Sequence, residues 1–454
     1  MINIKIDSRK IVPGDTFVAL RGATVDGHDF INKAIEAGAT KVVVEHDVDC
    51  SVEKLIVEDT NKWLTDYISE TYSKEINEMN IIGVTGTNGK TTTAYLTYQI
   101  LNALGSKTAY IGTIGFYQPD KEFIELPNTT PNILDLYELF LTAKENGCKN
   151  VMMEVSSHAL HQERVKGINY KVAAFTNLTQ DHLDYHETMD NYLDAKKLIL
   201  KQLEGPMIVN IDDPYGVKWT DYNNTLTLGT NGTDYKIISY NDTEHGTMIN
   251  FSAKEKEYQV ETNLRSTFNV YNYLTALSLI NNLGFSIEDI IKVTSSIYPP
   301  KGRCEQIKVK DGEAVVDYAH TPDAVEKIIN AFTENKKGRV ITIVGCGGDR
   351  DPKKRPIMGR IAAENSDYVV FTSDNPRTED PQTIMDNILA GVSTNNYEVE
   401  LDRRTAIKKA LDMIEKDDVV LILGKGHEDY QIIGHEKIHL DDAEEVRKYI
   451  ENTK

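Results

Sequence analysis

Residues 80–104, "NIIGVTGTNGKTTTAYLTYQILNAL", combine a strand, a glycine-rich turn and a helix, and they constrain the fold more than any other stretch. Ile81 and Ile82 begin an apolar run of strand type, and "TTTAYLTYQILNAL" has helical spacing. "TGTNGK" lies between them, where free N–H groups at the start of a helix can face an anion. Gly86 and Gly89 allow positive φ and a close approach of the backbone. The stretch therefore predicts an α/β sheet with a phosphate-binding loop.

The glycine spacing of this loop differs from the common pattern of Gly, four residues and then Gly-Lys-Ser/Thr. The first glycine of that pattern would fall at position 84, where the chain has Val84, and the glycine is Gly86 instead. This spacing argues against ordinary GTPases and kinases. A turn without a ligand is the alternative, but the strand, glycines, lysine and threonines together favour nucleotide binding. Lys90 would neutralise the β- and γ-phosphates, and Thr91 or Thr92 would hold Mg²⁺.

The 454 residues divide into three regions, which agrees with the usual size of a domain. Residues 1–79 carry short strand-type runs around the helical stretch "FINKAIEAGA". Residues 80–299 alternate strand and helix signals, which predicts a largely parallel sheet with helices on both faces. Within them, residues 224–262 predict a small antiparallel insert. Residues 300–454 begin at "YPPKGRCEQ" and alternate strand and helix signals again. We therefore predict an α/β protein of three domains.

Charge and cysteine content exclude several classes of function. The formal net charge is −20, which opposes binding to nucleic acid or to an anionic membrane. The four cysteines form no C-x-x-C pair, so neither a zinc site nor a disulfide framework is predicted, and free thiols fit a reducing cytoplasm. The start "MINIKIDSRK" has no apolar core, and no run is long enough to span a bilayer. We expect a cytoplasmic, monomeric protein that binds small molecules.

Polar residues follow two further strands of the central region. Glu154, in "MMEVSSHAL", comes at the end of one strand, and His182 follows "VAAFTN". Ligands of open α/β sheets bind at the carboxyl ends of the strands, so both side chains are expected near the phosphate loop. A carboxylate and an imidazole beside a threonine hydroxyl would suit Mg²⁺. Each residue alone is a weak signal, since a histidine after a strand is more often a turn or packing residue.

The third region shows polar residues at strand ends as well. These residues are Arg350 in "GCGGDRD", Asp374, Asn375 and Arg377 in "DNPRTED", and Gly424 and Glu428 in "GKGHE". Arginine binds a carboxylate through two hydrogen bonds, and a carboxylate pairs with an ammonium. The set fits a zwitterionic, amino-acid-like ligand, and the alternative is a group of solvated turn residues. An ATP site and an amino-acid pocket together predict ATP-driven amide formation, in which an acyl phosphate supplies the leaving group.

Ordered motifs throughout the chain resemble those of the Mur ligases. The motifs are "TGTNGKTTT", "NTTP", "EVSSHAL", "TNLTQDHLDYH", "YLDAK", "FNVYN", "DYAHTPD", "GCGGDRD", "DNPRTED" and "GKGHE". With the N-terminal "DSR" they run from Ser8 to Glu428 and cover nearly the whole chain. The resemblance is to members that add the third residue to UDP-N-acetylmuramoyl-L-alanyl-D-glutamate (UDP-MurNAc-dipeptide) in peptidoglycan synthesis. It implies a UDP-sugar-binding domain at 1–79, a central ATPase at 80–299 and a Rossmann-like, amino-acid-binding domain at 300–454.

The resemblance also implies roles for individual residues. ATP would be bound by Gly86, Thr87, Asn88, Gly89, Lys90, Thr91, Thr92, Asn269, Arg303, Asp317 and His320. The sugar-peptide would be bound by Ser8, Thr129, Thr130, Ser156, Gln162 and Arg164. Diaminopimelate would be bound by Arg350, Asp374, Asn375, Arg377, Gly424 and Glu428. The catalytic residues would be Lys90, Glu154, His182 and Lys196, and Mg²⁺ would be held by Thr91, Glu154, His182 and Lys196. The motif implies that Lys196 is carbamylated to N6-carboxylysine, although spacing alone does not separate it from Lys197.

The "DNPR" form of the C-terminal motif is similar to members that add meso-diaminopimelate. Diaminopimelate differs from lysine by a distal carboxylate, which Arg377 can satisfy. L-lysine or another diamino acid is an alternative substrate. A folylpolyglutamate-type ligase is a second alternative, but such enzymes lack the N-terminal domain that "DSRKIVPGDTFVALRG" resembles. A nucleotide-dependent switch without ligase chemistry is a third. Ser266 stands where the family usually has glycine, which should alter a turn more than the chemistry.

Overall fold

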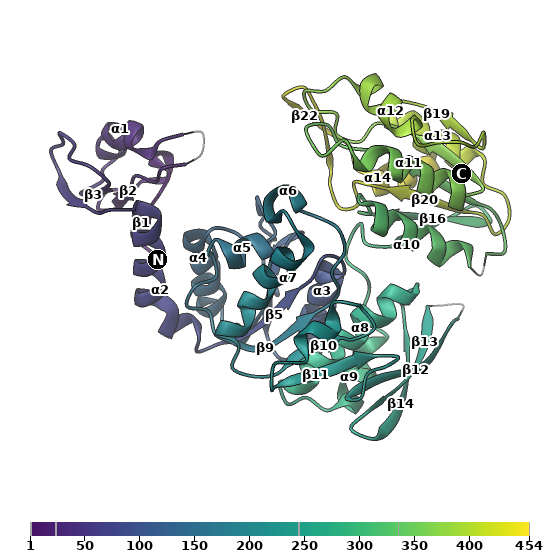
Figure 1. Ribbon diagram of the computed structural model, residues 1–454, viewed down its shortest axis with the longest axis horizontal. Coiled ribbons are helices and arrows are strands. Elements are labelled where there is room, and N and C mark those ends of the chain that lie inside the picture. Colours follow the sequence, from purple (N-terminus) through teal and green to yellow (C-terminus); the bar gives the residue numbers. More distant parts are fainter. Residues whose placement is uncertain (1, 23–24, 244–245, 335, 454) are drawn as a thin grey trace. The chain divides into compact units, whose positions relative to one another are not determined.

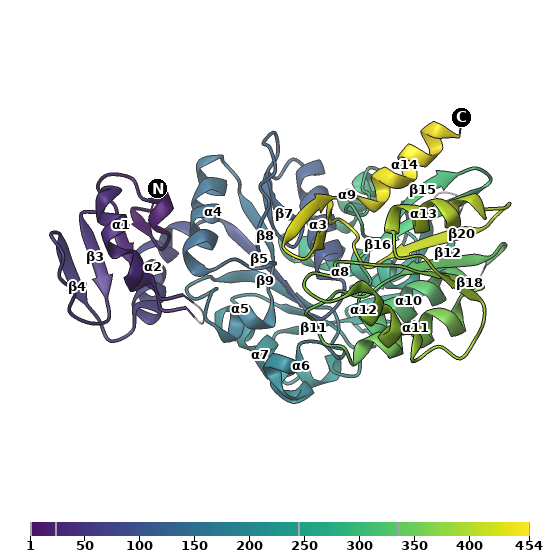
Figure 2. The ribbon, with the colours of Figure 1, turned by 90° about the horizontal axis from the view of Figure 1, so that it is seen from above.

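The structure is a computed structural model that describes residues 2–22, 25–243, 246–334 and 336–453. The chain forms two compact units, and Figures 1 and 2 show its helices and strands. Unit 1 comprises residues 1–85, 101–174 and 190–207, and unit 2 comprises residues 86–100, 175–189 and 208–454. Among the described residues, no helix is both long enough and apolar enough to cross a bilayer.

The N-terminal part of unit 1 is a parallel four-stranded sheet. Its strands are β1 (Ile4–Lys5), β2 (Thr16–Val18), β3 (Lys41–Val44) and β4 (Glu53–Ile56), in the order β1-β2-β3-β4. The associated helices are η1 (Ser8–Lys10), η2 (Gly27–Phe30), α1 (Ile31–Glu36) and α2 (Thr60–Ile76). Ile31 and Ala34 of α1 pack on Phe17, Val42 and Val44 of the sheet, and this small core holds the region together.

The largest sheet has ten strands in the order β14-β13-β12-β11-β10-β9-β5-β8-β6-β7. Part of this sheet lies mostly in unit 1. Its strands there are β5 (Asn80–Thr85), β6 (Thr108–Gly112), β7 (Gly115–Tyr117), β8 (Asn150–Glu154) and β9 (Tyr170–Phe175). The helices of this part are α4 (Ile133–Glu145), α5 (Ser157–His161), α7 (Met189–Lys197) and η3 (Leu198–Gln202). Strand β8 pairs with β5 and β6 in parallel, as the continuous apolar runs predict.

The part of this sheet in unit 2 consists of β10 (Met207–Asn210), β11 (Thr225–Gly229), β12 (Tyr235–Asp242), β13 (Thr247–Ala253) and β14 (Lys256–Thr262). Its helices are α3 (Lys90–Ala103), α6 (Leu183–His186), η4 (Gly216–Trp219), α8 (Thr267–Asn282) and α9 (Ile287–Thr294). Strands β12, β13 and β14 are antiparallel, as predicted for residues 224–262. They continue the sheet at its edge, because β11 pairs with β12 in parallel.

The C-terminal part of unit 2 is a six-stranded sheet in the order β15-β16-β20-β17-β18-β19. Its strands are β15 (Glu305–Val309), β16 (Gly312–Asp317), β17 (Val340–Val344), β18 (Tyr368–Phe371), β19 (Tyr397–Val399) and β20 (Val419–Leu423). Only β15 is antiparallel to its neighbour among the described pairs. Two hydrophobic clusters cover its two faces, so the sheet is doubly wound.

The helices of this part are α10 (Pro322–Thr333), α11 (Lys354–Asn365), α12 (Pro381–Leu389), α13 (Arg403–Asp412) and α14 (Asp442–Asn452). Side chains of α10, α11 and α12 pack in one cluster, and those of α13 and α14 pack in the other. The start of α10 shows how the sequence specifies these helices. Thr321 accepts a hydrogen bond from Ala324 N, and Pro322 occupies the first turn.

A separate two-stranded hairpin, β21 (Tyr430–Ile433) and β22 (Glu436–His439), follows β20. This hairpin was not predicted from the sequence. The three predicted domain ranges each contain complete sheets, with β1–β4 in 1–79, β5–β14 in 80–299 and β15–β22 in 300–454. The boundaries between these domains stay a prediction. All four cysteines are free thiols, and Cys148, Cys304 and Cys346 are buried.

Candidate active site

The loop before α3 has the glycine conformation that the sequence predicts. Gly86 has φ of +145° and Gly89 has φ of +83°, which residues with a Cβ rarely adopt. A Cβ on Gly86 would lie 2.0 Å from Thr176 Oγ1, and a Cβ on Gly89 would lie 2.4 Å from Asn272 Oδ1. Both glycines are therefore required by space as well as by backbone conformation.

The end of β9 holds this loop in unit 2. Thr87 N donates to Asn177 O at 2.8 Å, and Asn88 N donates to Asn177 Oδ1 at 2.9 Å. Thr176 Oγ1 donates to Asn88 O at 2.6 Å. The sequence analysis placed polar residues after this strand, but it did not assign Thr176 or Asn177 a role. Their contacts hold the loop against the end of β9.

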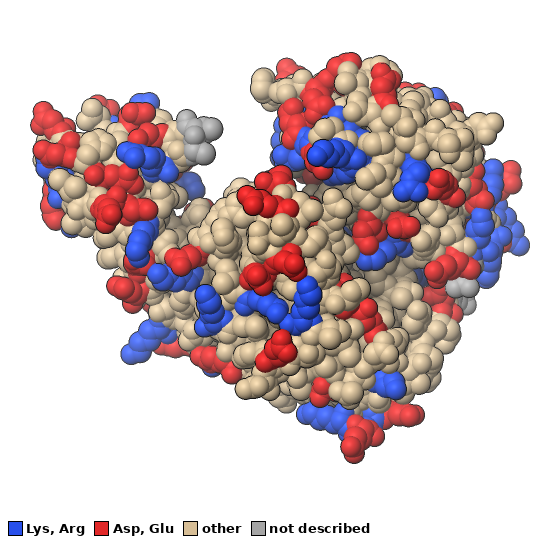
Figure 3. Space-filling view, viewed as in Figure 1, with Lys and Arg blue, Asp and Glu red and all other residues tan. Residues whose placement is uncertain are grey.

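Two cations lie beside the loop. Lys90 Nζ donates to Gly86 O at 2.9 Å and to Thr87 O at 2.7 Å. Arg303 Nη2 donates to Thr91 Oγ1 at 3.3 Å. On the face shown in Figure 3, acidic and basic side chains are interspersed. Lys90 and Arg303 therefore supply local positive charge where a nucleotide's phosphates would need it.

Arg303 belongs to an aromatic cluster formed by the "DYAHTPD" and "GKGHE" motifs. Its guanidinium carbon lies 4.5 Å from the centre of the Tyr318 ring. The Tyr318 ring contacts the rings of His320 and His427, with centroid distances of 4.6 and 5.1 Å. Burial lowers the pKa of both histidines, and for His427 the pKa falls to about 3 because Arg303 and two lysines are also near. Both imidazoles are therefore neutral at pH 7.

Asp317 and Asn269 occupy buried positions in the same unit. Asp317 accepts hydrogen bonds from Cys304 N at 2.7 Å and Ala319 N at 2.8 Å, while burial raises its pKa. Asn269 is buried on α8 and accepts a 3.0 Å hydrogen bond from Asn272 Nδ2. Ser266, which precedes α8, has φ of +83°. A glycine at that position would relieve the backbone, in agreement with the turn effect expected there.

Glu154 is fully buried at the end of β8 in unit 1. Its Oε1 accepts hydrogen bonds from Tyr110 Oη at 2.5 Å and Thr113 N at 2.9 Å. Its Oε2 accepts from Thr113 Oγ1 at 3.1 Å. These donors hold the carboxylate in one orientation. Neither Tyr110 nor Thr113 was singled out by the sequence analysis, because their role depends on the pairing of β6 beside β8.

Unit 1 also brings together most residues predicted to bind the sugar-peptide. Thr130 Oγ1 donates to Glu154 O at 2.9 Å and accepts from Ser156 N at 3.1 Å. Arg164 Nη1 donates to Thr130 O at 3.1 Å, and Arg164 Nε donates to Gln162 Oε1 at 3.0 Å. Thr113 connects to this group through a 3.0 Å contact between its Oγ1 and Thr129 Oγ1. The network ties five of the six predicted residues to Glu154.

The other predicted residues lie separately. Ser8 is half-buried in η1. Lys196 of α7 is 1% exposed, with Nζ 4.4 Å from the centre of the Tyr192 ring, whereas Lys197 is less buried. His182 has φ of +53° before α6, its side chain is 49% exposed, and Nε2 lies 3.3 Å from Asp181 Oδ2.

The residues predicted to bind Mg²⁺ are divided between the units. Glu154 and Lys196 belong to unit 1, while Thr91 and His182 belong to unit 2. Within the described ranges, no group of three or more His, Cys, Asp and Glu side chains is arranged to hold a metal ion. The buried Glu154 carboxylate and the Thr91 hydroxyl are nevertheless oxygen donors of the kind Mg²⁺ takes from proteins, since it keeps several waters.

The loops after β17 and β18 bring the two predicted pocket arginines into neighbouring segments. Gly348 N donates to Asn375 O at 2.9 Å, and Arg377 Nη1 donates to Gly348 O at 2.7 Å. Thr378 Oγ1 donates to Asp349 Oδ1 at 2.8 Å, next to Arg350. The loop that carries Arg350 is thereby joined to the loop that carries Arg377.

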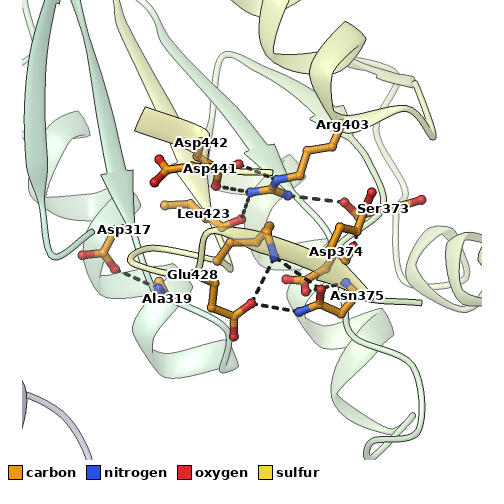
Figure 4. Close-up of polar contacts among 12 residues, drawn as sticks. Asp317, Ala319, Ser373, Asp374, Asn375, Arg403, Leu423, Glu428, Asp441 and Asp442 are labelled. Carbon is orange, nitrogen blue, oxygen red and sulfur yellow. Dashed lines mark hydrogen bonds and ion pairs between the residues drawn. The ribbon is translucent and has the colours of Figure 1, made fainter. Parts of the chain in front are cut away.

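Figure 4 shows the polar contacts of Asn375 and Glu428. Glu428 Oε2 accepts from Asn375 Nδ2 at 2.9 Å and from Lys425 Nζ at 3.0 Å. Lys425 is fully buried and also donates to Asn375 Oδ1 at 3.3 Å. Gly424 has φ of +113°, and a Cβ there would lie 2.7 Å from Asp374 Oδ2. The structure therefore brings Asp374, Asn375, Gly424 and Glu428 together, and it adds Lys425.

A buried ion pair that sequence reasoning missed supports both loops. Arg403 Nη2 lies 2.7 Å from Asp442 Oδ2, and neither side chain is exposed (Figure 4). Arg403 also donates to Leu423 O at 3.0 Å and Ser373 O at 3.5 Å. Leu423 and Ser373 directly precede Gly424 and Asp374. No local motif marks Arg403, since its partners come from three other segments.

Three comparisons place these features among known proteins. The family models described as Mur ligase family, catalytic domain; Mur ligase middle domain; and Mur ligase, glutamate ligase domain match residues 2–84, 84–280 and 302–426. UDP-N-acetylmuramoyl-L-alanyl-D-glutamate–2,6-diaminopimelate ligase 1 of Clostridium acetobutylicum is 42% identical and covers 99% of this chain and 94% of its own.

Solved structures agree with these matches. A solved UDP-N-acetylmuramoyl-L-alanyl-D-glutamate–2,6-diaminopimelate ligase has a TM-score of 0.70 and 30% identity, covering 100% of this chain and 95% of its own. The MurF ligase of Thermotoga maritima in complex with ADP has a TM-score of 0.71 at 21% identity, over 99% and 97% of the two chains, and shares the fold.

Proposed function

The chain belongs to the Mur ligase family, and from this premise we propose that it adds meso-diaminopimelate to UDP-N-acetylmuramoyl-L-alanyl-D-glutamate in peptidoglycan precursor synthesis. Its enzyme class is that of the family, an ATP-dependent, ADP-forming ligase. The observation that carries the choice of amino acid is Arg377, whose loop also presents Asn375 and is hydrogen-bonded to Glu428. In this proposal the Arg377 guanidinium binds a carboxylate of the amino acid and the Glu428 carboxylate binds an ammonium.

The three sheet-containing ranges take separate tasks in this proposal. Residues 1–79 bind the UDP-sugar, residues 80–299 bind ATP, and residues 300–454 bind the amino acid. The network around Thr130 and Arg164 binds the sugar-peptide, because it offers hydroxyl and guanidinium donors next to Glu154. Asn269, Arg303, Asp317 and His320 contact the nucleotide.

The chain's own groups account for the chemical steps. A carboxylate oxygen of the dipeptide attacks the γ-phosphorus of ATP, the bond to the β-phosphate oxygen breaks, and ADP leaves. Lys90 and the N–H groups of the loop offset the charge that shifts to the β-phosphate. The amine of diaminopimelate then attacks the acyl carbon, the bond from this carbon to the phosphate oxygen breaks, and inorganic phosphate leaves with the proton that the amine loses.

We infer that the metal is Mg²⁺, because hydroxyl and carboxylate oxygens are the donors that it takes from proteins. Thr91, Glu154 and His182 would hold it, and Lys196 would contribute as N6-carboxylysine. When bound, Mg²⁺ supplies additional positive charge to the phosphate oxygens. Burial of Lys196, compared with Lys197, supports its choice as the modified residue. Mass spectrometry of the intact protein, with and without bicarbonate, tests the modification.

The amino-acid pocket would recognise both charged groups at the distal end of diaminopimelate. The Arg377 guanidinium binds the distal carboxylate, and Glu428 pairs with the distal ammonium. Arg350, Asp374 and Gly424 complete the pocket. L-lysine lacks the distal carboxylate, so it leaves Arg377 without this partner. Loss of one hydrogen bond to a charged group costs about 1.5–3 kcal/mol, or roughly 10- to 150-fold in kcat/KM.

The decisive experiment measures amino-acid-dependent phosphate release with ATP, Mg²⁺ and UDP-MurNAc-dipeptide. The wild type should prefer diaminopimelate to lysine, and Arg377→Ala should lose most of this preference. Arg360→Ala is the matched control, because Arg360 is exposed on α11 and pairs only with Glu364 among the described ion pairs. Equal or better use of lysine by the wild type would refute the assignment.

Location and oligomeric state are part of the proposal as well. Four free thiols support a cytoplasmic location. A monomer is our prediction, and light scattering at several protein concentrations tests it.

A further inference from the structure

The hairpin β21–β22 has no part in the mechanism described so far. It begins two residues after Glu428, and its strands pair only with each other among the described strands. Strand β22 is exposed at all four positions. On β21, in contrast, Gln431 is 6% exposed. The hairpin therefore turns β21 toward the protein, and its neighbour there is the loop of residues 374–377.

Four hydrogen bonds join β21 and its turn to this loop. Gln431 Nε2 donates to Asp374 O at 2.7 Å, and Ile432 N donates to Asn375 Oδ1 at 3.0 Å. Arg377 N donates to Ile432 O at 3.0 Å, and Gly434 N donates to Arg377 O at 2.7 Å. Arg377 thereby forms a parallel bridge with Ile433. The loop is therefore joined to the hairpin by one isolated β-bridge.

This contact explains an unusual backbone at the pocket. Arg377 has φ of +53°, in the left-handed region that disfavours side chains other than glycine, asparagine and aspartate. The hairpin binds both the N–H and the C=O of Arg377, so it stabilises this conformation from both sides. The direction of the Arg377 side chain depends on this backbone, since a return to ordinary φ would redirect the Cα–Cβ bond.

We propose that the β21–β22 hairpin is a template for substrate selectivity, and that Gln431 is a positioning residue for Arg377. The inference rests on the proposed function, and it identifies the part of the chain that sets the preference for diaminopimelate over lysine. Gln431 anchors the start of the loop, while the Ile432 and Gly434 backbone groups anchor its end. The hairpin would thus favour an amino acid with a distal carboxylate without touching it.

The test compares diaminopimelate and lysine as substrates of Gln431→Met, which keeps the length of the side chain and removes the donor. We expect kcat/KM for diaminopimelate to fall about three- to tenfold, with a smaller change for lysine and an unchanged KM for ATP. Glu436→Gln is the matched control, because Glu436 is exposed on β22 of the same hairpin. Gln431→Glu, which loses the donor when ionised, is the second variant if Gln431→Met does not fold.

A double-mutant cycle separates positioning from simple destabilisation. If Gln431 acts through Arg377, then Gln431→Met should not change the preference further in the Arg377→Ala background. An unchanged preference in Gln431→Met, or equal losses for both amino acids, overturns the inference while the wild-type preference stands. A wild type that prefers lysine overturns the proposed function instead, so the two failures are distinguishable.

Discussion

Replacing Gly89 by alanine tests whether the tight loop is required by space or only by backbone conformation. Gly89 has φ of +83°, and Gly105, just after α3, has φ of +76°. A Cβ at Gly105 would meet nothing within 4 Å, whereas a Cβ at Gly89 would lie 2.4 Å from Asn272 Oδ1. Gly105→Ala is therefore a control that has the same backbone cost and no collision.

The expected magnitudes follow from these two contacts. Alanine in the left-handed region costs about 1–2 kcal/mol of folding stability at either position. At Gly89 the new Cβ would also lie 2.4 Å from Asn272 Oδ1, which is 1.0 Å closer than the 3.4 Å at which ordinary van der Waals contact begins. Asn272 is buried and hydrogen-bonded to Asn269, so its side chain is not free to move away. The phosphate loop must therefore shift to make room for the new Cβ. A displacement of about 1 Å in a catalytic loop costs roughly 100-fold in rate.

The assay measures phosphate release as a function of ATP concentration, together with thermal unfolding. Gly89→Ala should lower kcat/KM for ATP by about 100-fold, and Gly105→Ala should leave it within about twofold while unfolding at a lower temperature. Asn272→Ala should restore part of the activity of Gly89→Ala by removing the colliding atom. Equal activity of the two alanine variants would refute the spatial argument.

Three other changes have outcomes that the structure predicts. Arg403→Met leaves the Asp442 carboxylate buried without its partner, so urea unfolding should show a free energy of unfolding lower by about 3–5 kcal/mol. A decrease of less than about 1 kcal/mol would contradict a stabilising role for the ion pair. Glu154→Gln can keep the oxygen that accepts from Thr113 N, so the free energy of unfolding should change by less than about 1 kcal/mol. The rate of phosphate release should fall by more than about tenfold. Full activity of this variant would exclude a catalytic role for Glu154. The pKa of His427 is about 3 in the folded protein, so only the unfolded chain takes up its proton as pH falls below about 6.5, and folding loses roughly 2 kcal/mol by pH 5. His427→Gln should remove this part of the acid sensitivity in unfolding curves, and identical pH profiles would argue against a neutral buried imidazole.

The sheets could be predicted where the strands are buried on both faces. Strand β17 is buried at all five positions, and its continuous apolar run identifies it without knowledge of its neighbours. The hairpin β21–β22 was missed because β22 is exposed throughout and carries no alternation of apolar and polar residues. Such a strand is defined by its partner, which a local pattern does not reveal.

In the candidate site, too, residues with a local sequence signal could be predicted and residues defined by distant contacts could not. Gly86 and Gly89 could be identified from spacing, because the backbone conformation they allow is a local property. Asn272, which forms the wall against Gly89, and Gln431, which anchors Asp374, could not be identified. Their roles arise from contacts between distant segments, and an asparagine or glutamine in a helix or strand has no signature of such a contact. The family resemblance supplied several residues that the patterns alone did not, including Lys196.

The left-handed backbone of Arg377 has a consequence for how the enzyme can evolve. Glycine at this position would recover about 1 kcal/mol or more of folding stability while removing the guanidinium. Under the proposed function, a change from arginine to glycine that loses the preference for a distal carboxylate would therefore stabilise the fold, and the reverse change would destabilise it. Random drift at this codon would favour a more stable, less discriminating ligase, so the arginine persists only where selection for the correct cross-linking amino acid opposes that drift.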